Sequence, residues 1–255
     1  MENLLENYGP LGLPVAHSQP STTGMIEPAL VLVCKRPGLG IGKQRLAASL
    51  GREAANQVAE ALLACALEDA RAWPGPVIIA PAHREDYAWA KALLPQICPR
   101  VYIEPQAEGN LGQRLNILDG GLRTTGWERL VYIGSDAPSL SAADYAAASE
   151  ALEHHDSVLA PSRDGGVVLM ATRKHWPPLG DLPWSTPGLG MALADCCRRA
   201  GRSVAILTPG FDVDEKDDLA RLIISLSQER RPARRALREL AGHLVQLSEM
   251  DHVRF

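Results

Sequence analysis

Apolar and polar positions follow two alternating patterns along the first 155 residues. Short apolar runs predict buried strands at 29–34, 76–80, 100–104 and 130–133. Longer segments between them carry apolar side chains at helical spacing, as at Val58, Leu62 and Cys65, and predict helices at 52–73, 83–94, 111–124 and 142–153. Strands that alternate with helices predict βαβ units, and therefore an α/β fold with a mainly parallel sheet.

The alternation of strands and helices changes after residue 156. Two apolar runs, 158–160 and 167–170, flank the turn sequence Ser162-Arg163-Asp164-Gly165-Gly166, which predicts a hairpin instead of a crossover. A helix at 187–199, a strand at 203–207 and helices at 215–227 and 232–246 follow. We expect a loose tail at 1–27, one domain at 28–228 and a C-terminal helical extension at 229–255.

Composition narrows the functional classes. The chain has 255 residues, 46% of them hydrophobic and 22% charged, as in ordinary globular proteins. Its formal net charge of -4 argues against nucleic-acid binding, and no apolar run is long enough to span a bilayer. The first residues do not resemble a signal peptide, and the five cysteines form no C-x-x-C pair. We therefore expect a cytoplasmic protein with small-molecule ligands. The last predicted helix carries an apolar stripe that could pack on the domain or on a second subunit, so a homodimer is possible.

Asp136 is the most informative candidate. It follows the predicted strand 130–133 and Gly134, so it should lie outside the carboxyl edge of the sheet, where α/β proteins bind ligands. A carboxylate there needs a cation, and Mg²⁺ or Mn²⁺ carrying a phosphorylated substrate would supply one. The alternative is a turn or helix-capping role, but Ser141 and Asp144 already form a plausible cap for the next helix.

A glycine-rich basic loop follows the first predicted strand. Glycines allow backbone N–H groups to approach an anion, and cations neutralise phosphate charge. The loop matches neither a Walker motif nor G-x-G-x-x-G, and a solvated surface loop is the alternative. Its place after the first strand favours phosphate binding, with Lys43 also as a catalytic cation. The residues expected to bind phosphate are Lys35, Pro37, Gly38, Gly40, Gly42, Lys43 and Arg45.

Two further acids stand at the ends of strands or turns. Asp164 either begins the hairpin turn or acts in catalysis, by positioning the acceptor or serving as a base. Asp214 either caps the helix that begins near Glu215 or joins Asp136 as a metal ligand. The sequence leaves both pairs of alternatives open.

Six sequence motifs follow one another along the chain: the basic loop, 109–115, 133–138, 164–166, 183–186 and 212–214. In this order they resemble the bacterial radical-SAM-associated transferase family of the glycosyltransferase-A (GT-A) superfamily. The 2-phospho-lactate and molybdenum-cofactor guanylyltransferases are more distantly similar. The resemblance spans about residues 29–219. It implies a single nucleotide-diphospho-sugar-transferase domain with three α/β/α layers and a mainly parallel mixed sheet.

The resemblance also implies roles for individual residues. Asp136 would stand where the superfamily places its metal-binding acid, Asn110, Gly112 and Arg114 would line the nucleotide cleft, and the acceptor would meet Gly165, Gly166, Trp184 and Ser185. This chain departs from the family at Gln44, where threonine is usual, and at Val167, where an aromatic residue is usual. The loss of the aromatic residue at 167 weakens the case for stacking against the acceptor. A catalytically inactive member of the family remains an alternative.

These expectations together indicate a metal-dependent transferase with a nucleotide-activated donor. A glycosyltransferase acting on a small-molecule acceptor is the first interpretation. A nucleotidyltransferase that releases pyrophosphate is the alternative, because Ser135-Asp136-Ala137 lacks the Asp-x-Asp of most GT-A glycosyltransferases. A nucleotide-binding protein without turnover is the third.

Overall fold

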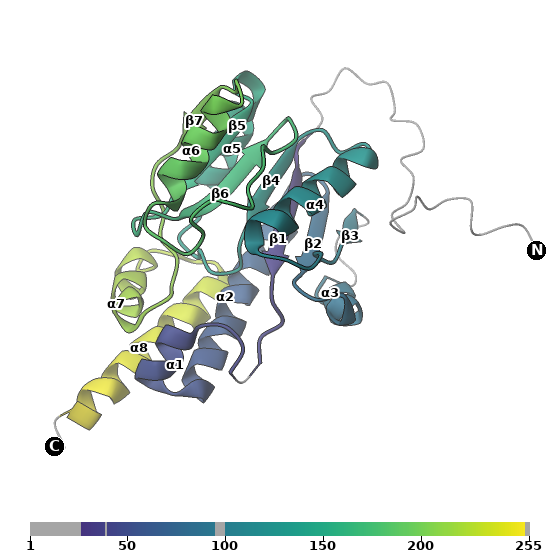
Figure 1. The fold of residues 1–255 in the computed structure, drawn as a ribbon. Helices are drawn as coiled ribbons and strands as arrows, with labels where there is room; N and C mark the ends of the chain where they lie inside the picture. Colours follow the sequence, from purple (N-terminus) through teal and green to yellow (C-terminus); the bar gives the residue numbers. More distant parts are fainter. Residues whose placement is uncertain (1–26, 39, 95–99, 253–255) are drawn as a thin grey trace, which may run out of the picture.

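Seven strands form one mixed sheet in the computed structural model, which describes residues 27–38, 40–94 and 100–252 (Figure 1). The strand order is β3-β2-β1-β4-β6-β5-β7, and only β6 runs antiparallel to its neighbours. The strands are β1 (Ala29–Cys34), β2 (Val77–Pro81), β3 (Val101–Ile103), β4 (Leu130–Ile133), β5 (Ser157–Pro161), β6 (Val167–Thr172) and β7 (Val204–Ile206). The expected mainly parallel sheet and the hairpin of β5 and β6 are both confirmed.

The helices also follow the predicted order. They are α1 (Gln44–Leu50), α2 (Arg52–Ala72), α3 (Tyr87–Ala92), α4 (Leu111–Thr124), α5 (Ala142–His154), α6 (Leu189–Arg199), α7 (Lys216–Ser225) and α8 (Pro232–His252). A 3₁₀ turn, η1 (Arg84–Asp86), replaces the start of the helix expected from residue 83. The sequence analysis did not predict α1. Gly51, at a φ of 86°, ends α1 and begins α2, because glycine adopts this left-handed conformation without strain. The tail expected at 1–27 lies almost entirely outside the described residues.

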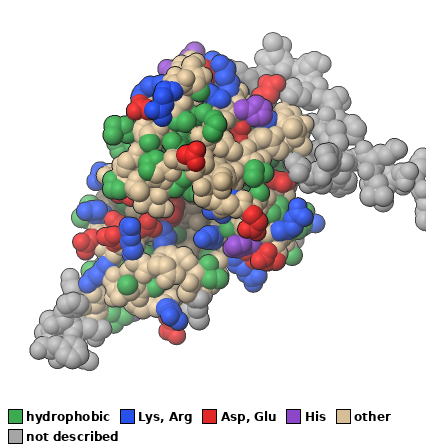
Figure 2. All heavy atoms as spheres, in the orientation of Figure 1, with side chains coloured by type: hydrophobic (Ala, Val, Ile, Leu, Met, Phe, Trp, Pro, Cys, Tyr) green, Lys and Arg blue, Asp and Glu red, His purple; other side chains and the backbone are tan. Residues whose placement is uncertain are grey.

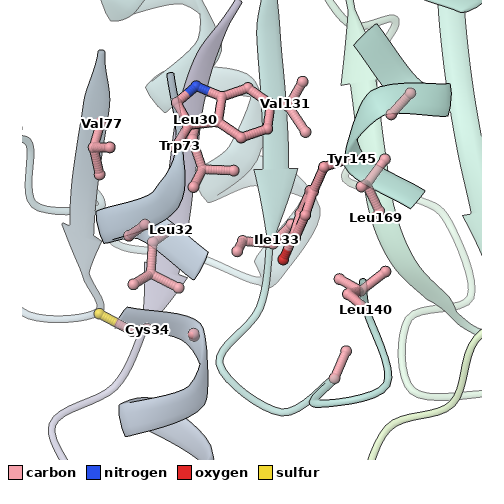
Figure 3. Close-up of a cluster of buried hydrophobic side chains, with 14 of the residues drawn as sticks. Leu30, Leu32, Cys34, Trp73, Val77, Val131, Ile133, Leu140, Tyr145 and Leu169 are labelled. Atoms are coloured by element: carbon pink, nitrogen blue, oxygen red, sulfur yellow. The ribbon is translucent and has the colours of Figure 1, made fainter. Parts of the chain in front are cut away.

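Alternate residues of each strand supply two apolar layers, as the period of a strand requires. On one face, Leu30, Leu32 and Ile133 pack against α2, α3 and α5. Figure 3 shows this layer, in which the rings of Trp73 and Tyr145 meet edge to face at 5.7 Å. On the other face, Val31, Ile78 and Tyr132 pack against α4 and α6, which lie in front of the sheet in Figure 1. The domain therefore has the three α/β/α layers that the resemblance implied.

A third apolar cluster joins four helices beside the sheet. Leu46 of α1, Val58 and Leu62 of α2, Leu222 of α7 and Leu237 of α8 are all buried in it. Helix α8 packs along α2 and α7 (Figure 1). The apolar stripe of the last helix thus covers this cluster, although Leu247 near its end stays exposed. None of the helices in the described parts of the chain is long and apolar enough to cross a membrane.

Candidate functional site

Three carboxylates meet at the carboxyl edge of the sheet. Asp136 follows β4, and Asp212 and Asp214 come from the extended segment before α7. One carboxylate oxygen from each lies within 4.8 Å of the other two. Gly134 leaves room for this arrangement, because a Cβ at that position would lie 2.6 Å from Asp136 Oδ1. The structure thus brings together Asp136 and Asp214, both expected from the sequence, and adds Asp212.

Backbone contacts explain why Asp212 and Asp214 point the same way. Val213 N donates to the carbonyl oxygen of Asp136 at 3.0 Å, and the Val213 side chain is buried in the apolar cluster of α1, α2, α7 and α8. In extended backbone, the residues on either side of a buried one face the other direction. The carboxylate of Asp218, instead of that of Asp214, accepts the N–H groups at the start of α7. The Asp214 carboxylate therefore remains available to a cation.

Lys43 lies between two of these acids. Its Nζ is 2.7 Å from Asp214 Oδ1 and 3.4 Å from Asp136 Oδ2, and its side chain is only 12% exposed. Burial lowers the pKa of Lys43, but the charges of Asp136 and Asp214 outweigh burial and raise it overall. Lys43 has a φ of 45°, uncommon for a residue with a side chain, at the position that begins α1. The basic loop and Asp136 therefore converge, as the sequence analysis expected.

Negative charge at the site exceeds what Lys43 balances. The pKa of Asp212 is raised to about 6, chiefly by burial and further by the charges of Asp136, Asp164 and Asp214, while a hydrogen bond from Ser162 Oγ lowers it. The donor set consists only of carboxylate oxygens, which suits the hard cations Mg²⁺ and Mn²⁺. These residues can hold a divalent cation.

This excess charge gives a prediction for stability. In metal-free buffer at pH 7.5, Asp212→Asn should raise the unfolding temperature by about 2–4 °C for each kcal/mol of relieved repulsion. The raised pKa means that the folded protein gains a proton at Asp212 as pH falls through about 6, whereas the unfolded chain gains it near the ordinary aspartate pKa of 3.8. The advantage of the variant should therefore shrink between pH 6 and 4, as followed by circular dichroism. An equal advantage at both ends of this range would contradict the assignment.

A cavity of about 580 Å³ opens beside the acids. Figure 2 shows the molecule hollowed across the middle of one face, with acidic and basic side chains near the hollow. Most of the site residues expected from the sequence line the cavity: Lys35, Pro37, Gly42, Lys43, Arg45, Arg114, Asp136, Asp164, Gly166, Trp184, Ser185 and Asp214.

Five expected site residues do not line this cavity and have structural contacts instead. Asn110 caps α4, accepting a hydrogen bond from Gln113 N, and a Cβ at Gly112 would lie 2.1 Å from the Leu179 carbonyl oxygen. A Cβ at Gly165 would lie 1.9 Å from the carbonyl oxygen of Pro187. Gly38 and Gly40 take part in a reversal of the basic loop, in which Ile41 N donates to the carbonyl oxygen of Gly38. Gly112 and Gly165 thus permit close backbone approach, whereas Gly40 adopts a positive φ of 78° in the loop.

Two side chains that line the cavity have buried polar atoms without a hydrogen-bond partner among the described residues. Gln106, 7% exposed, donates through Nε2 to the carbonyl oxygen of Ala80 at 2.7 Å, which leaves its Oε1 without a donor. Nε of Arg114 is likewise unpaired. Buried polar atoms are rarely left unpaired, so both atoms are candidates to contact a ligand. Arg114 was expected from its sequence motif, whereas Gln106 lies in no motif and was not predicted.

Asp164 combines the two roles that the sequence left open. Its Oδ1 accepts the Gly166 N–H at 3.0 Å, as in a side-chain-stabilised turn, and the residue also lines the cavity. It is outside the group of three close carboxylates. Trp184 lines the cavity as well, while its Nε1 donates to the carbonyl oxygen of Leu179.

Comparison with known proteins identifies the family. Residues 47–186 match the family described as uncharacterized protein conserved in bacteria (DUF2064). The chain belongs to this family. The match includes Asp136 and Asp164 and excludes Lys43, Asp212 and Asp214. No curated protein matches the chain. Nothing found bears on the radical-SAM association, which stays a prediction.

Solved structures show which fold the chain shares. One, from Desulfovibrio desulfuricans G20, carries the provisional name nucleotide-diphospho-sugar transferase; it has a TM-score of 0.76 and 24% identity, over 87% of this chain and 98% of that one. Another, 4-diphosphocytidyl-2C-methyl-D-erythritol synthase from Anaerococcus prevotii DSM 20548, has a TM-score of 0.50 and 11% identity, over 80% and 99%. The chain therefore has the nucleotide-diphospho-sugar transferase fold that was expected.

Proposed function

We propose that this protein is a metal-dependent transferase that uses a nucleotide-activated donor. The observation that carries the proposal is the meeting of Lys43 with Asp136 and Asp214, beside Asp212 and at the mouth of the cavity. Acids and a buried cation at one edge of an α/β sheet suit a ligand that combines a divalent metal with phosphate.

Each group has a role in such a reaction. Asp136, Asp212 and Asp214 would hold Mg²⁺ or Mn²⁺, which when bound stabilises negative charge on phosphate oxygens. Lys43 would bind the phosphate that departs, and the fixed positive charge of Arg114 would face the same cavity. The exposed cations Lys35 and Arg45 would attract the anion to the cavity.

The acceptor side is proposed where the β5–β6 turn and the loop before α6 line the cavity. Asp164, Gly166, Trp184 and Ser185 line it there, and Ser185 has a φ of 62°. Strained backbone at non-glycine residues occurs preferentially at ligand-binding sites. Asp164 keeps one carboxylate oxygen outside its turn hydrogen bond, so we propose that it orients the acceptor or accepts its proton.

Transfer of a glycosyl group to a small-molecule acceptor is the first form of this proposal. Nucleotidyl transfer is the second, favoured by one observation: after β4 a single acid, Asp136, is followed by Ala137 and Pro138. The products separate the two. Glycosyl transfer releases a nucleoside diphosphate from a nucleotide-sugar, whereas nucleotidyl transfer releases pyrophosphate from a nucleoside triphosphate.

Calorimetry tests the shared part of the proposal. UDP, GDP, CDP, ADP and their triphosphates should be titrated into the protein with and without Mn²⁺. We expect one base to bind best, and only with the metal. Absence of metal-dependent binding across the whole panel would overturn the proposal.

Gln106 gives a prediction for the nucleoside part of the ligand. It bonds to the end of β2, which lies two strands, or about 10 Å, from β4, the strand that Asp136 follows. We expect Gln106→Met to weaken binding of the preferred nucleoside diphosphate by about 5- to 100-fold, as for a lost hydrogen bond to a buried group. Binding of pyrophosphate with Mn²⁺ should not change. Equal losses for both ligands would place Gln106 outside the nucleoside site.

A further inference from the structure

Arg234 of α8 is fully buried, although it lies outside the residues that match the family. All five of its N–H donors are used. Nε donates to the carbonyl oxygen of Pro138, Nη1 to that of Cys65 and to Glu68, and Nη2 to that of Leu140 and to Asp69. A buried guanidinium is tolerated only when its charge is paired and its donors are satisfied. This geometry is therefore specific to arginine, since a lysine has three donors on one atom.

Two of these five bonds reach the segment that carries Asp136. Pro138 and Leu140 lie two and four residues after Asp136, in the connection between β4 and α5. The same connection is held from its other side by the segment that carries Asp212 and Asp214. There, Val213 N donates to the carbonyl oxygen of Asp136, and Ser139 Oγ donates to that of Phe211 at 2.9 Å.

The remaining bonds fix Arg234 itself to the body of the domain. Asp69 of α2 accepts from Arg234 at 2.7 Å, from Tyr145 of α5 at 2.8 Å and from Arg231 at 2.8 Å. Its side chain is 3% exposed. Arg234 thus connects α2, the Asp136 connection and α8. Helix α8 also packs on α7, which begins two residues after Asp214.

We propose that Arg234 is a positioning residue for the acids of the site: by fixing the carbonyls of Pro138 and Leu140 it holds Asp136 where it faces Asp212 and Asp214. The C-terminal helix is then part of the functional site. This inference rests on the proposed function, because it assumes that these acids bind a divalent cation.

Paired substitutions separate positioning from general stabilisation. Arg234→Lys keeps the charge but cannot reach all five acceptors. Arg231→Lys is the matched control: Arg231 belongs to the same ion cluster, donating to Asp69 and Glu229, and among the described residues it makes no hydrogen bond to segment 136–140. Both variants should lower the unfolding temperature. At a temperature where both are folded by circular dichroism, only Arg234→Lys should weaken Mn²⁺ binding, by about 10- to 100-fold, as for groups that orient metal ligands.

Amide hydrogen exchange supplies a second measurement. Exchange at 135–141 should become faster in Arg234→Lys and stay unchanged in Arg231→Lys. If Arg234→Lys does not fold, Glu68→Gln replaces it, because it weakens only one of the five contacts; a few-fold loss of Mn²⁺ affinity is then expected.

The outcomes separate the two levels of the proposal. Equal Mn²⁺ affinity and equal exchange in the Arg234 and Arg231 variants, or unchanged affinity in Glu68→Gln, would overturn the role of Arg234 and leave the proposed function standing. If the wild-type protein binds no Mn²⁺, alone or with the nucleoside diphosphates UDP, GDP, CDP and ADP, the proposed metal site itself is wrong and the inference falls with it.

Discussion

We expect Asp136→Asn to abolish metal-dependent nucleotide binding. The amide keeps the shape of the side chain but removes a unit charge from the three-carboxylate group. One unit charge acting at ~4 Å contributes ~4 kcal/mol at an effective dielectric constant near 20, which corresponds to about a thousandfold in affinity. Calorimetry with Mn²⁺ and the preferred nucleoside diphosphate measures the loss.

The matched control is Asp217→Asn. It makes the same chemical change at an exposed carboxylate in the first turn of α7, outside the acid group. We expect wild-type binding from this variant. If Asp136→Asn binds as well as Asp217→Asn, Asp136 is not a metal ligand.

Lys43→Met should change two affinities in opposite directions. Lys43 Nζ contacts the carboxylates that would hold the metal, so removing its charge should strengthen binding of Mn²⁺ alone. Binding of a nucleoside triphosphate with Mn²⁺ should weaken by up to about a thousandfold, because the same charge would then face phosphate. Both affinities can be measured by titration of one protein sample.

Arg52→Met is the control for Lys43. Arg52 begins α2, is exposed and does not line the cavity, so both of its effects should be small. If Lys43→Met weakens binding of both Mn²⁺ and the triphosphate, Lys43 supports the structure of the site and does not compete with the metal. If it changes neither, Lys43 has no part in ligand binding.

The fold was largely predictable because its elements are strongly patterned. The four strands of the parallel part and the Asp164–Gly166 turn carry unambiguous local signals. Helix α1 escaped prediction because it begins directly after a glycine-rich loop and ends at Gly51. The packing of α8 could not be predicted from local sequence patterns, because the contacts of Arg234 join residues as far as 169 positions apart.

The site was predictable where a residue ends a strand. Asp136 follows β4 and Lys43 lies in the loop after β1, and the parallel pairing of these two strands brings both to one edge. Asp212 had a usable signal, because the alternation Asp212-Val213-Asp214 places both acids on one side of an extended segment. Gln106 had none, since its unpaired oxygen depends on the position of the Ala80 carbonyl.

The hairpin turn and the loop before α6 touch through their backbones. Gly165 meets Pro187 so closely that no side chain fits between them, and Gly190 N donates to the carbonyl oxygen of Gly165 at 2.8 Å. Asp164 and the pair Trp184 and Ser185 are thereby mechanically coupled. Gly165 has a φ of 90°, and a side chain there would have to displace the Pro187 backbone, so Gly165→Ala would shift these two parts of the cavity lining together.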